Sequence, residues 1–242
     1  MLLKVNRLEK SFEDDKIVFS DINFSVAQKE FVSIVGPSGC GKTTLLHIIA
    51  NLLQPTKGNI KFFGDNTSKG ILIFQEYNKT LFPWKTVYEN VEFVLRHFPL
   101  IERKVRVEKY LQMVRLEESY DKYPWQLSGG MQQRVAIARA LATEPKLLLM
   151  DEPFGSLDAN MRKELELQLL DLWHKLDITI LLVTHDIDEA IFLSNKIIIM
   201  KGTPSKITKD IIIDIPYPRD YLNTKNSIVF REYRVQIMKC FD

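Results

Sequence analysis

The sequence predicts an α/β fold built on a mainly parallel sheet, and three observations lead to this prediction. A short apolar run over Phe31–Val35 ends at a glycine loop and is followed by a helix that is apolar on nearly every side. Two continuous apolar runs, Leu147–Met150 and Ile178–Val183, are typical of central parallel strands. Apolar residues at helical spacing, from Met161 to Leu176, separate these two runs. Strands that alternate with helices in this way favour an α/β core.

The other elements follow from spacing along the chain. Alternating apolar residues predict short strands at Val5–Leu8 and Ile22–Val26, and the buried helix after the glycine loop is expected over Thr43–Leu53. Apolar residues recur at helical spacing through residues 86–141, which predicts a mostly helical subdomain. The last expected elements are strands at Ile197–Met200 and Ile211–Ile215 and a helix at Val229–Met238.

These elements predict one domain over residues 1–242. Its core comprises about residues 1–85 and 142–220, the helical subdomain about 86–141, and the C-terminal helix about 221–242.

Composition limits the possible functions. Basic and acidic residues nearly balance, 33 against 31, so the chain carries no overall charge signal for nucleic acid. The two cysteines, Cys40 and Cys240, lie in no metal-binding or disulfide pattern, which favours a reducing compartment. The N-terminus lacks a secretion signal, and no apolar run approaches the ~20 residues that span a bilayer. A role at a membrane would therefore require a partner that spans it.

The strongest motif is GPSGCGKT at Gly36–Thr43, which matches the phosphate-binding loop GxxxxGK[ST]. Its glycines allow backbone N–H groups to surround phosphate oxygens, and the following helix directs its N-terminus at the same anion. Lys42 would contact the β- and γ-phosphates of ATP, and the Thr43 hydroxyl would bind Mg²⁺. The alternative, a glycine turn with a solvated lysine, does not explain the preceding strand and the following buried helix. The predicted nucleotide-binding residues are Gly36, Pro37, Ser38, Gly39, Cys40, Gly41, Lys42, Thr43 and Thr44, with Cys40 as a small residue that fills space in the loop.

Two carboxylates follow the apolar run LLLM at residues 147–150. Asp151 is predicted to hold Mg²⁺ through water, and Glu152 to orient or deprotonate the water that attacks the γ-phosphate. Acidic residues often end strands without any such role, so this prediction depends on the phosphate loop.

A third motif, LSGGMQQR at Leu127–Arg134, places Ser128, Gly129 and Gly130 before a helical run. A helix N-terminus of this kind can bind an anion. Because one phosphate loop already serves one nucleotide, a second phosphate site implies a second nucleotide or a second chain. By physical reasoning alone, a glycine-rich helix start without any ligand is equally acceptable.

Taken together, the phosphate loop, LLLMDEP and LSGGMQQR resemble the ATP-binding-cassette (ABC) ATPases over nearly the whole chain. The resemblance implies a RecA-like phosphate-loop core, an N-terminal antiparallel β subdomain and an inserted helical subdomain. It also implies that two subunits pair head to tail, so that Ser128, Gly129, Gly130 and Asp158 of one chain close over ATP on the other. The bound cofactors would be ATP and Mg²⁺.

Further positions match the family motifs. Gln75 matches the glutamine that reaches Mg²⁺ and the attacking water, although without the other motifs a polar strand end would be the preferred interpretation. Ser156-Leu157-Asp158 matches the loop that contacts the opposite subunit. His185 matches the histidine that contacts the γ-phosphate, and Phe12 the aromatic residue that stacks on adenine. As isolated residues, both would more often belong to a core.

Two segments resemble import ATPases for nitrate, sulfonates, taurine and related solutes: LFPWKTVYEN at Leu81–Asn90 and IPYPRD at Ile215–Asp220. In such proteins the first segment receives a short helix of the membrane subunit, so Phe82 and Trp84 are candidate contacts. Burial in the chain's own core is the alternative for both residues. The sequence departs from the subfamily at Trp125, where a histidine is frequent, and in the spacing between Gln75 and Pro83.

The resemblance therefore implies the energy-coupling subunit of an importer, peripheral to the cytoplasmic face of a bacterial membrane. Its partners would be a second cassette, identical in a homodimer, a membrane-spanning permease and an external solute-binding protein, with no nucleic acid. The competing hypothesis is a non-transport ABC ATPase that acts on DNA or ribosomes. The 114 residues between Gly36 and Asp151 contain no sustained heptads for the coiled coil of the DNA-repair type, and the chain carries one cassette where the ribosome type has two. An unrelated kinase or GTPase leaves LSGG unexplained.

Overall fold

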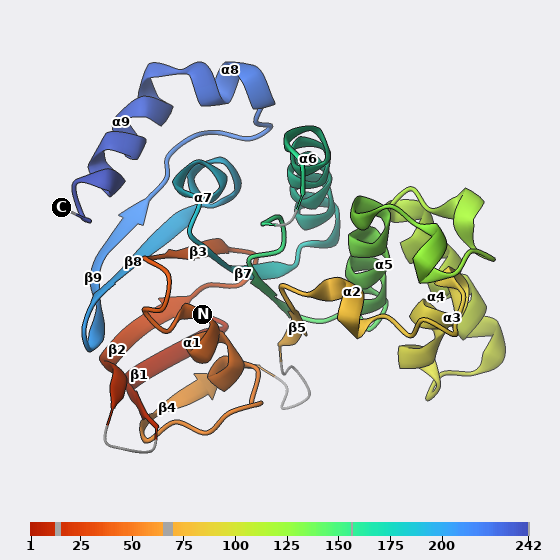
Figure 1. Ribbon diagram of the computed structural model, residues 1–242, viewed down its shortest axis with the longest axis horizontal. Coiled ribbons are helices and arrows are strands. Elements are labelled where there is room, and N and C mark those ends of the chain that lie inside the picture. Colours follow the sequence, from red (N-terminus) through yellow and green to blue (C-terminus); the bar gives the residue numbers. More distant parts are fainter. Residues whose placement is uncertain (13–15, 65–69, 156, 242) are drawn as a thin grey trace.

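The computed structural model describes residues 1–12, 16–64, 70–155 and 157–241 of the chain. They form a mixed nine-stranded sheet with the strand order β4-β1-β2-β9-β8-β3-β7-β6-β5 (Figure 1). Within those residues, no helix is both long enough and apolar enough to cross a membrane. The strands are β1 Leu3–Ser11, β2 Ile17–Val26, β3 Phe31–Val35, β4 Lys57–Phe62, β5 Ile71–Ile73, β6 Leu147–Asp151, β7 Thr179–Thr184, β8 Lys196–Gly202 and β9 Ser205–Ile212.

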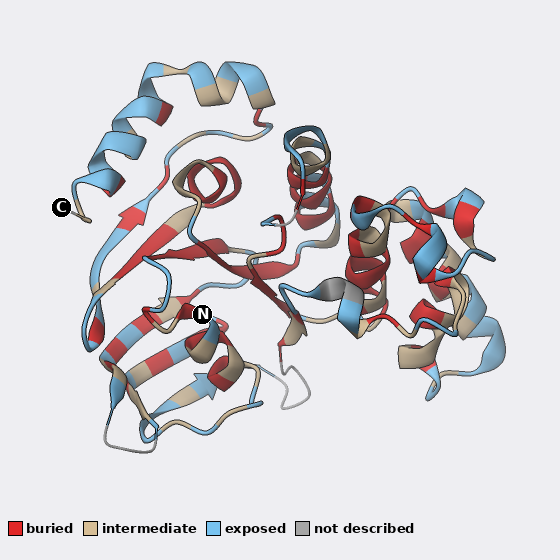
Figure 2. Cartoon of the chain, viewed as in Figure 1, coloured by how far each residue is buried: buried red, intermediate tan, exposed pale blue. Residues whose placement is uncertain are grey.

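The middle of the sheet is parallel, as the continuous apolar runs predict. β3 pairs in parallel with β7 and β8, and β6 pairs in parallel with β5 and β7. Every residue of β3, β6 and β7 is buried, because helices or other strands cover both faces (Figure 2). Alternate side chains of β3 point to opposite faces: Phe31 and Val35 join one core cluster, and Val32 and Ile34 join the other.

The N-terminal strands are antiparallel. β1 pairs antiparallel with both β2 and β4, which confirms the expected antiparallel β portion next to the parallel core. This portion packs with helix α1 (Lys42–Ile49) around the core cluster that contains Val32 and Ile34, at the lower left of Figure 1. The mixed α/β fold class predicted from the sequence is therefore confirmed.

The helices after α1 surround the core cluster that contains Phe31 and Val35. α3, α4 and α5 pack on one another to form a lobe that extends away from the sheet, at the right of Figure 1. α6 and α7 lie against the parallel strands, and α9 packs on α7. The helices are α2 Tyr77–Thr80, α3 Val87–Glu92, α4 Leu100–Met113, α5 Gly129–Leu141, α6 Ala159–Leu176, α7 Ile187–Leu193, α8 Tyr221–Asn226 and α9 Ile228–Met238, with short 3₁₀ turns at Phe93–Leu95, Glu117–Ser119 and Pro124–Gln126.

Several predicted bounds differ from the structure. Strands β1 and β2 extend beyond the predicted Val5–Leu8 and Ile22–Val26. Helix α1 ends at Ile49, because Asn51 takes a left-handed conformation with φ of 59° and the N–H groups of Leu52 and Leu53 both return to the carbonyl of His47. The last strand runs over Ser205–Ile212, not Ile211–Ile215. The strand begins at Ser205, which pairs with Gly202 across the tight turn after β8. Apolar residues continue to alternate beyond Ile212, where the pairing with β8 ends, and this alternation led the prediction to place the strand too late in the chain.

A buried arginine fixes the chain after β9. Arg219 donates five hydrogen bonds to the carbonyl oxygens of Ile191, Phe192, Ser194 and Ile215, at 2.7 to 3.2 Å. These bonds tie the segment IPYPRD to the end of α7, so this segment has a structural role in positioning α8 and α9.

Candidate functional site

The phosphate loop lies at the carboxyl end of the central strand β3 and leads directly into α1. In a parallel sheet this end of the strands is where α/β proteins bind their ligands. The loop must approach β8 closely: a Cβ atom at Gly36 would lie 2.3 Å from the carbonyl oxygen of Met200 and 2.8 Å from Sγ of Cys40. Only glycine fits this position. Cys40 is buried beside it, and burial raises the pKa of its thiol, so the residue acts as packing for the loop.

Lys42 is buried and curls back over the loop. Its Nζ donates to the carbonyl oxygens of Gly36 at 2.8 Å and Pro37 at 3.0 Å. The ammonium group therefore lies against the start of the loop, and Lys42 lines the same cleft as the other loop residues.

Thr43 and Asp151 are in contact at the N-terminus of α1. The Thr43 hydroxyl donates to Oδ1 of Asp151 at 3.0 Å, and burial raises the pKa of the Asp151 carboxyl. Among the described residues, no three acidic, histidine or cysteine side chains gather to hold a metal. One carboxylate and one hydroxyl nevertheless fit Mg²⁺ when the phosphates of a nucleotide supply further oxygens.

Glu152 and His185 form a second polar pair. Oε2 of Glu152 lies 2.9 Å from Nδ1 of His185, the residue that follows β7. The backbone of Glu152 has a φ of 42°, which is uncommon for a residue other than glycine, and its N–H donates to the carbonyl of Val183 at 2.9 Å. Strained conformations of this kind concentrate at functional sites. The Glu152 side chain is 18% exposed and that of His185 56%, so both reach the surface.

Lys42, Thr43 and Glu152 border a cleft of about 670 Å³, whereas the predicted residues Gly36, Asp151 and His185 are not among those that line it. Phe12 lies at its edge just after β1, half exposed, with Nζ of Lys10 4.9 Å from its ring centre. Gln75 follows β5, is exposed and lines the same cleft. The predicted residues that line it are Phe12, Pro37, Ser38, Gly39, Cys40, Gly41, Lys42, Thr43, Thr44, Gln75 and Glu152.

Other residues of the cleft were not predicted from the sequence. Lys16, Ile17 and Val18 come from the start of β2, and Gly202, Thr203 and Ser205 from the turn between β8 and β9. No local motif marks them, because they reach the cleft only through the order of strands in the sheet.

The signature residues lie elsewhere in the chain. Ser128 caps the N-terminus of α5, where its Oγ accepts from the N–H of Met131 at 3.3 Å. Ser128 and Gly130 line a separate hollow of about 140 Å³ against α6. Asp158 caps α6 by accepting from the N–H groups of Asn160 and Met161. Ser156 lies outside the described residues. The residues predicted to act on a second chain are therefore not among those that line the cleft.

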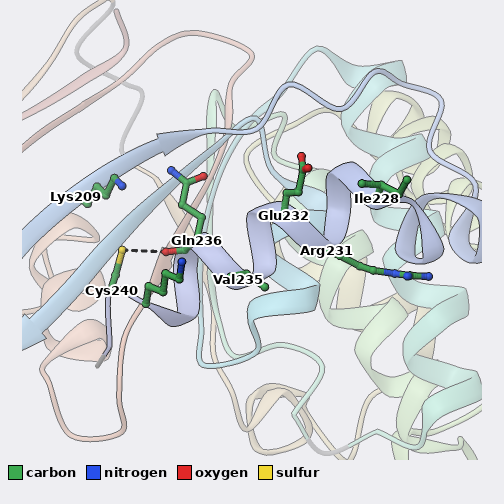
Figure 3. A pocket seen from close by; sticks show the side chains of 8 residues that line it. Lys209, Ile228, Arg231, Glu232, Val235, Gln236 and Cys240 are labelled. Carbon is green, nitrogen blue, oxygen red and sulfur yellow. Dashed lines mark hydrogen bonds between the residues drawn. The ribbon is translucent and has the colours of Figure 1, made fainter.

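A further groove of about 620 Å³ lies between β9 and α9, and Figure 3 shows its lining. Apolar Ile228 and Val235 alternate there with charged Lys209, Arg231 and Glu232. None of the predicted site residues lines this groove, and the phosphate loop is not part of it. The predicted nucleotide-binding residues therefore line the cleft at the end of β3 and not this groove.

Comparison with known proteins agrees with this geometry. Residues 19–155 match the ABC transporter family. The chain belongs to the ABC transporter family of ATP-hydrolysing cassettes. It is 44% identical, over its full length and 96% of the relative, to the aliphatic sulfonates import ATP-binding protein of Bacillus cereus. It is 43% identical, over 98% of its length and 38% of the relative, to the bicarbonate transport ATP-binding protein of Synechococcus elongatus.

Solved structures of the ABC family share the fold of this cassette. The cbiO1 protein of Clostridium perfringens, part of the ABC transporter complex cbiONQ, aligns with a TM-score of 0.81 and 28% identity over 97% of this chain and 98% of that one. The dimeric structure of a bacterial ABC transporter cassette aligns with a TM-score of 0.75 and 33% identity, over 89% of this chain and all of that one.

Proposed function

We propose that this cassette drives an importer for a small solute, as one of two ATP-hydrolysing subunits bound to a membrane permease. The observation that carries the ATPase part is the meeting of two polar pairs, Thr43–Asp151 and Glu152–His185, beside one phosphate loop. ATP hydrolysis requires a cation site and an oriented water at the same γ-phosphate, and these pairs supply the side chains for both.

Each residue has a distinct role in this proposal. Lys42 and the loop N–H groups hold the phosphates, and Phe12 stacks on the adenine. Thr43, Asp151 and Gln75 hold Mg²⁺, which would neutralise phosphate charge when bound. Glu152 orients the attacking water and accepts its proton.

His185 contacts the γ-phosphate and aligns the Glu152 carboxylate through its 2.9 Å bond. A glutamate held by a partner in this way needs little reorganisation when the reaction begins.

The separate hollow of the signature residues supports a pair of cassettes. Ser128, Gly129 and Gly130 lie at a helix N-terminus that can bind phosphate, yet they do not line the cleft of their own chain. In a head-to-tail homodimer these residues and Asp158 would close over ATP held by the other chain. The relative solved as a dimer supports this arrangement.

The permease would dock beside Trp84. Phe82 is partly buried against Phe93, with ring centres 4.6 Å apart, which favours a core role for Phe82. Trp84 is 70% exposed. Backbone bonds from Val87 and Tyr88 to residues 122 and 120 bring this segment next to the exposed, stacked pair Tyr123 and Trp125. Exposed aromatic residues of this kind anchor interfaces.

The transported solute is proposed to be a small oxyanion, such as a sulfonate. Relatives of comparable identity are named for aliphatic sulfonates and for bicarbonate, and both carry a small anionic oxygen group. The cassette would sit at the cytoplasmic face of a bacterial membrane, with an external solute-binding protein as a further partner. It would work as a single domain of residues 1–242, with the helical subdomain at about 86–141, and would not bind nucleic acid.

The test combines one substitution with native extraction. Glu152→Gln should keep ATP binding and lose hydrolysis, whereas Glu232→Gln on α9, away from the cleft, should change neither. Tagged Glu152→Gln protein, extracted with ATP in mild detergent, should retain a polytopic membrane protein. Hydrolysis by Glu152→Gln at the wild-type rate would refute the role of Glu152. Recovery of only ribosomes, nucleic acid or soluble partners would refute the transport function.

A further inference from the structure

Arg162, on the first turn of α6, links two loops that frame the Glu152–His185 pair. Its Nη1 donates to Oδ2 of Asp186 at 3.2 Å, and Asp186 directly follows His185. Its Nη2 lies 3.5 Å from the carbonyl oxygen of Leu157. Its backbone N–H donates to the carbonyl of Asp158 at 2.9 Å. One side chain thus touches both the loop before α6 and the turn after β7.

Asp186 is itself held firmly. Its Oδ1 accepts from the N–H groups of Asp188 and Glu189, at 2.9 and 3.1 Å, and so caps α7. Its own N–H donates to the Thr184 hydroxyl at 3.0 Å. Because one carboxylate oxygen caps the helix, only Oδ2 faces Arg162, and a shift of Arg162 would be transmitted to the backbone beside His185.

The contacts close into a ring. Glu152 bonds to His185, His185 is joined to Asp186, Asp186 pairs with Arg162, and Arg162 touches Leu157. Two short turn bonds return the chain from Leu157 to Glu152: Leu157 N–H to the carbonyl of Phe154 at 3.2 Å, and Gly155 N–H to the carbonyl of Glu152 at 3.3 Å. Each member of this ring is fixed by its two neighbours.

We propose that Arg162 is a positioning residue for ATP hydrolysis, which keeps Glu152 and His185 aligned and makes this alignment depend on the loop at Leu157 and Asp158. The proposal rests on the proposed function, in which Asp158 meets the partner cassette. Docking of that loop on a second copy of the chain would then act on the attacking-water site through Arg162.

A purely structural role is the competing explanation. Glu166 and Glu189 are buried close by, and the positive charge of Arg162 lowers the pKa of both carboxyls against the stronger effect of burial. If charge compensation were the whole role, removing a negative charge from Asp186 would relieve the cluster and leave hydrolysis intact. The two explanations therefore predict opposite results for Asp186→Asn.

The experiment compares four variants of the full chain: Arg162→Met, Arg162→Lys, Asp186→Asn and the double variant Arg162→Met/Asp186→Asn. Asn at 186 keeps an oxygen to cap α7 but loses the ion pair. The control is Lys175→Met, which removes an exposed ion pair with Asp171 from the far end of α6. For each protein we would measure kcat, the Kd for ATP and the thermal midpoint, and in a Glu152→Gln background the ATP-driven dimerisation.

We expect Arg162→Met and Asp186→Asn each to lower kcat roughly tenfold, since small misplacements of reacting groups cost one to two orders of magnitude. The Kd for ATP and the dimerisation should stay within about twofold of wild type. Arg162→Lys should recover part of kcat, because an ammonium can still reach Asp186. The double variant should be no slower than either single variant, since both break one link.

Three results would overturn the proposal: wild-type kcat in Arg162→Met, wild-type kcat in Asp186→Asn, or losses that multiply in the double variant. If Arg162→Met does not fold, Asp186→Asn and Arg162→Lys decide alone. The proposed function has its own test, because hydrolysis by Glu152→Gln at the wild-type rate would refute it whatever the Arg162 variants do.

Discussion

Substituting Gly36 by alanine tests how closely the phosphate loop must approach the sheet. The added Cβ would lie 2.3 Å from the backbone carbonyl oxygen of Met200, whereas an ordinary contact needs 3.4 Å or more. Since the obstacle is backbone on a central strand, no side-chain rotation can relieve it. The loop or β8 must move by roughly 1 Å, and a displacement of that size can cost roughly a hundredfold in rate. We expect kcat/KM for ATP hydrolysis to fall by about that factor.

Gly39→Ala is the matched control from the same loop. Nothing lies within 4 Å of a Cβ at Gly39, but its φ of 78° is unfavourable for alanine. The expected cost is therefore about 1 kcal/mol of stability with a much smaller loss of kcat/KM. Steady-state ATPase kinetics and thermal unfolding would be measured for both variants. A Gly36→Ala protein with kcat/KM within twofold of wild type, or one less impaired than Gly39→Ala, would refute the reasoning.

Three further predictions concern other parts of the chain. Arg219→Met should lower the free energy of unfolding by about 3 kcal/mol, because four carbonyl groups lose a charged donor; denaturant unfolding measures this, and a change below about 1 kcal/mol would contradict it. Burial raises the pKa of the Glu189 carboxyl well above its ordinary value, so its contribution to stability is lost as the pH rises above about 4.5. Glu189→Gln should flatten the fall in the free energy of unfolding with rising pH, so that the variant gains more over wild type at pH 8 than at pH 5. An unchanged pH dependence of unfolding would count against this prediction. Trp84→Ala and Trp125→Ala should change the free energy of unfolding by less than about 0.5 kcal/mol, because these side chains are 70% and 71% exposed. Both should nevertheless lose the permease in native extraction, and full retention by the double variant would place the interface elsewhere.

Local motifs carried most of what could be predicted about the site. The spacing from Gly36 to Thr43 and the carboxylates after β6 are short-range patterns, and the structure places Thr43 beside Asp151 as expected. Gln75 likewise lines the cleft, although isolated it resembled a polar strand end.

Long-range geometry could not be predicted in the same way. Lys16 and Thr203 reach the cleft because β2, β9 and β8 are neighbours in the sheet, an order that no window of sequence contains. Arg162 appears in the sequence as one of several charged residues on a helix. Its pairing with Asp186 depends on how α6 and α7 cross the sheet. Phe82 and Trp84 lie two residues apart, but only the packing of Phe93 distinguishes the partly buried side chain from the exposed one.

The separation of the cleft from the hollow at Ser128 has a genetic consequence. In a homodimer, one chain damaged at Lys42 and another damaged at Ser128 would each be inactive when expressed alone. In a mixed pair, the intact phosphate loop of the second chain would meet the intact signature of the first, and one complete composite site would form. Two inactivating alleles of this gene are therefore expected to restore partial activity when one changes the cleft and the other changes the hollow at Ser128. They are expected to restore none when both change the same feature.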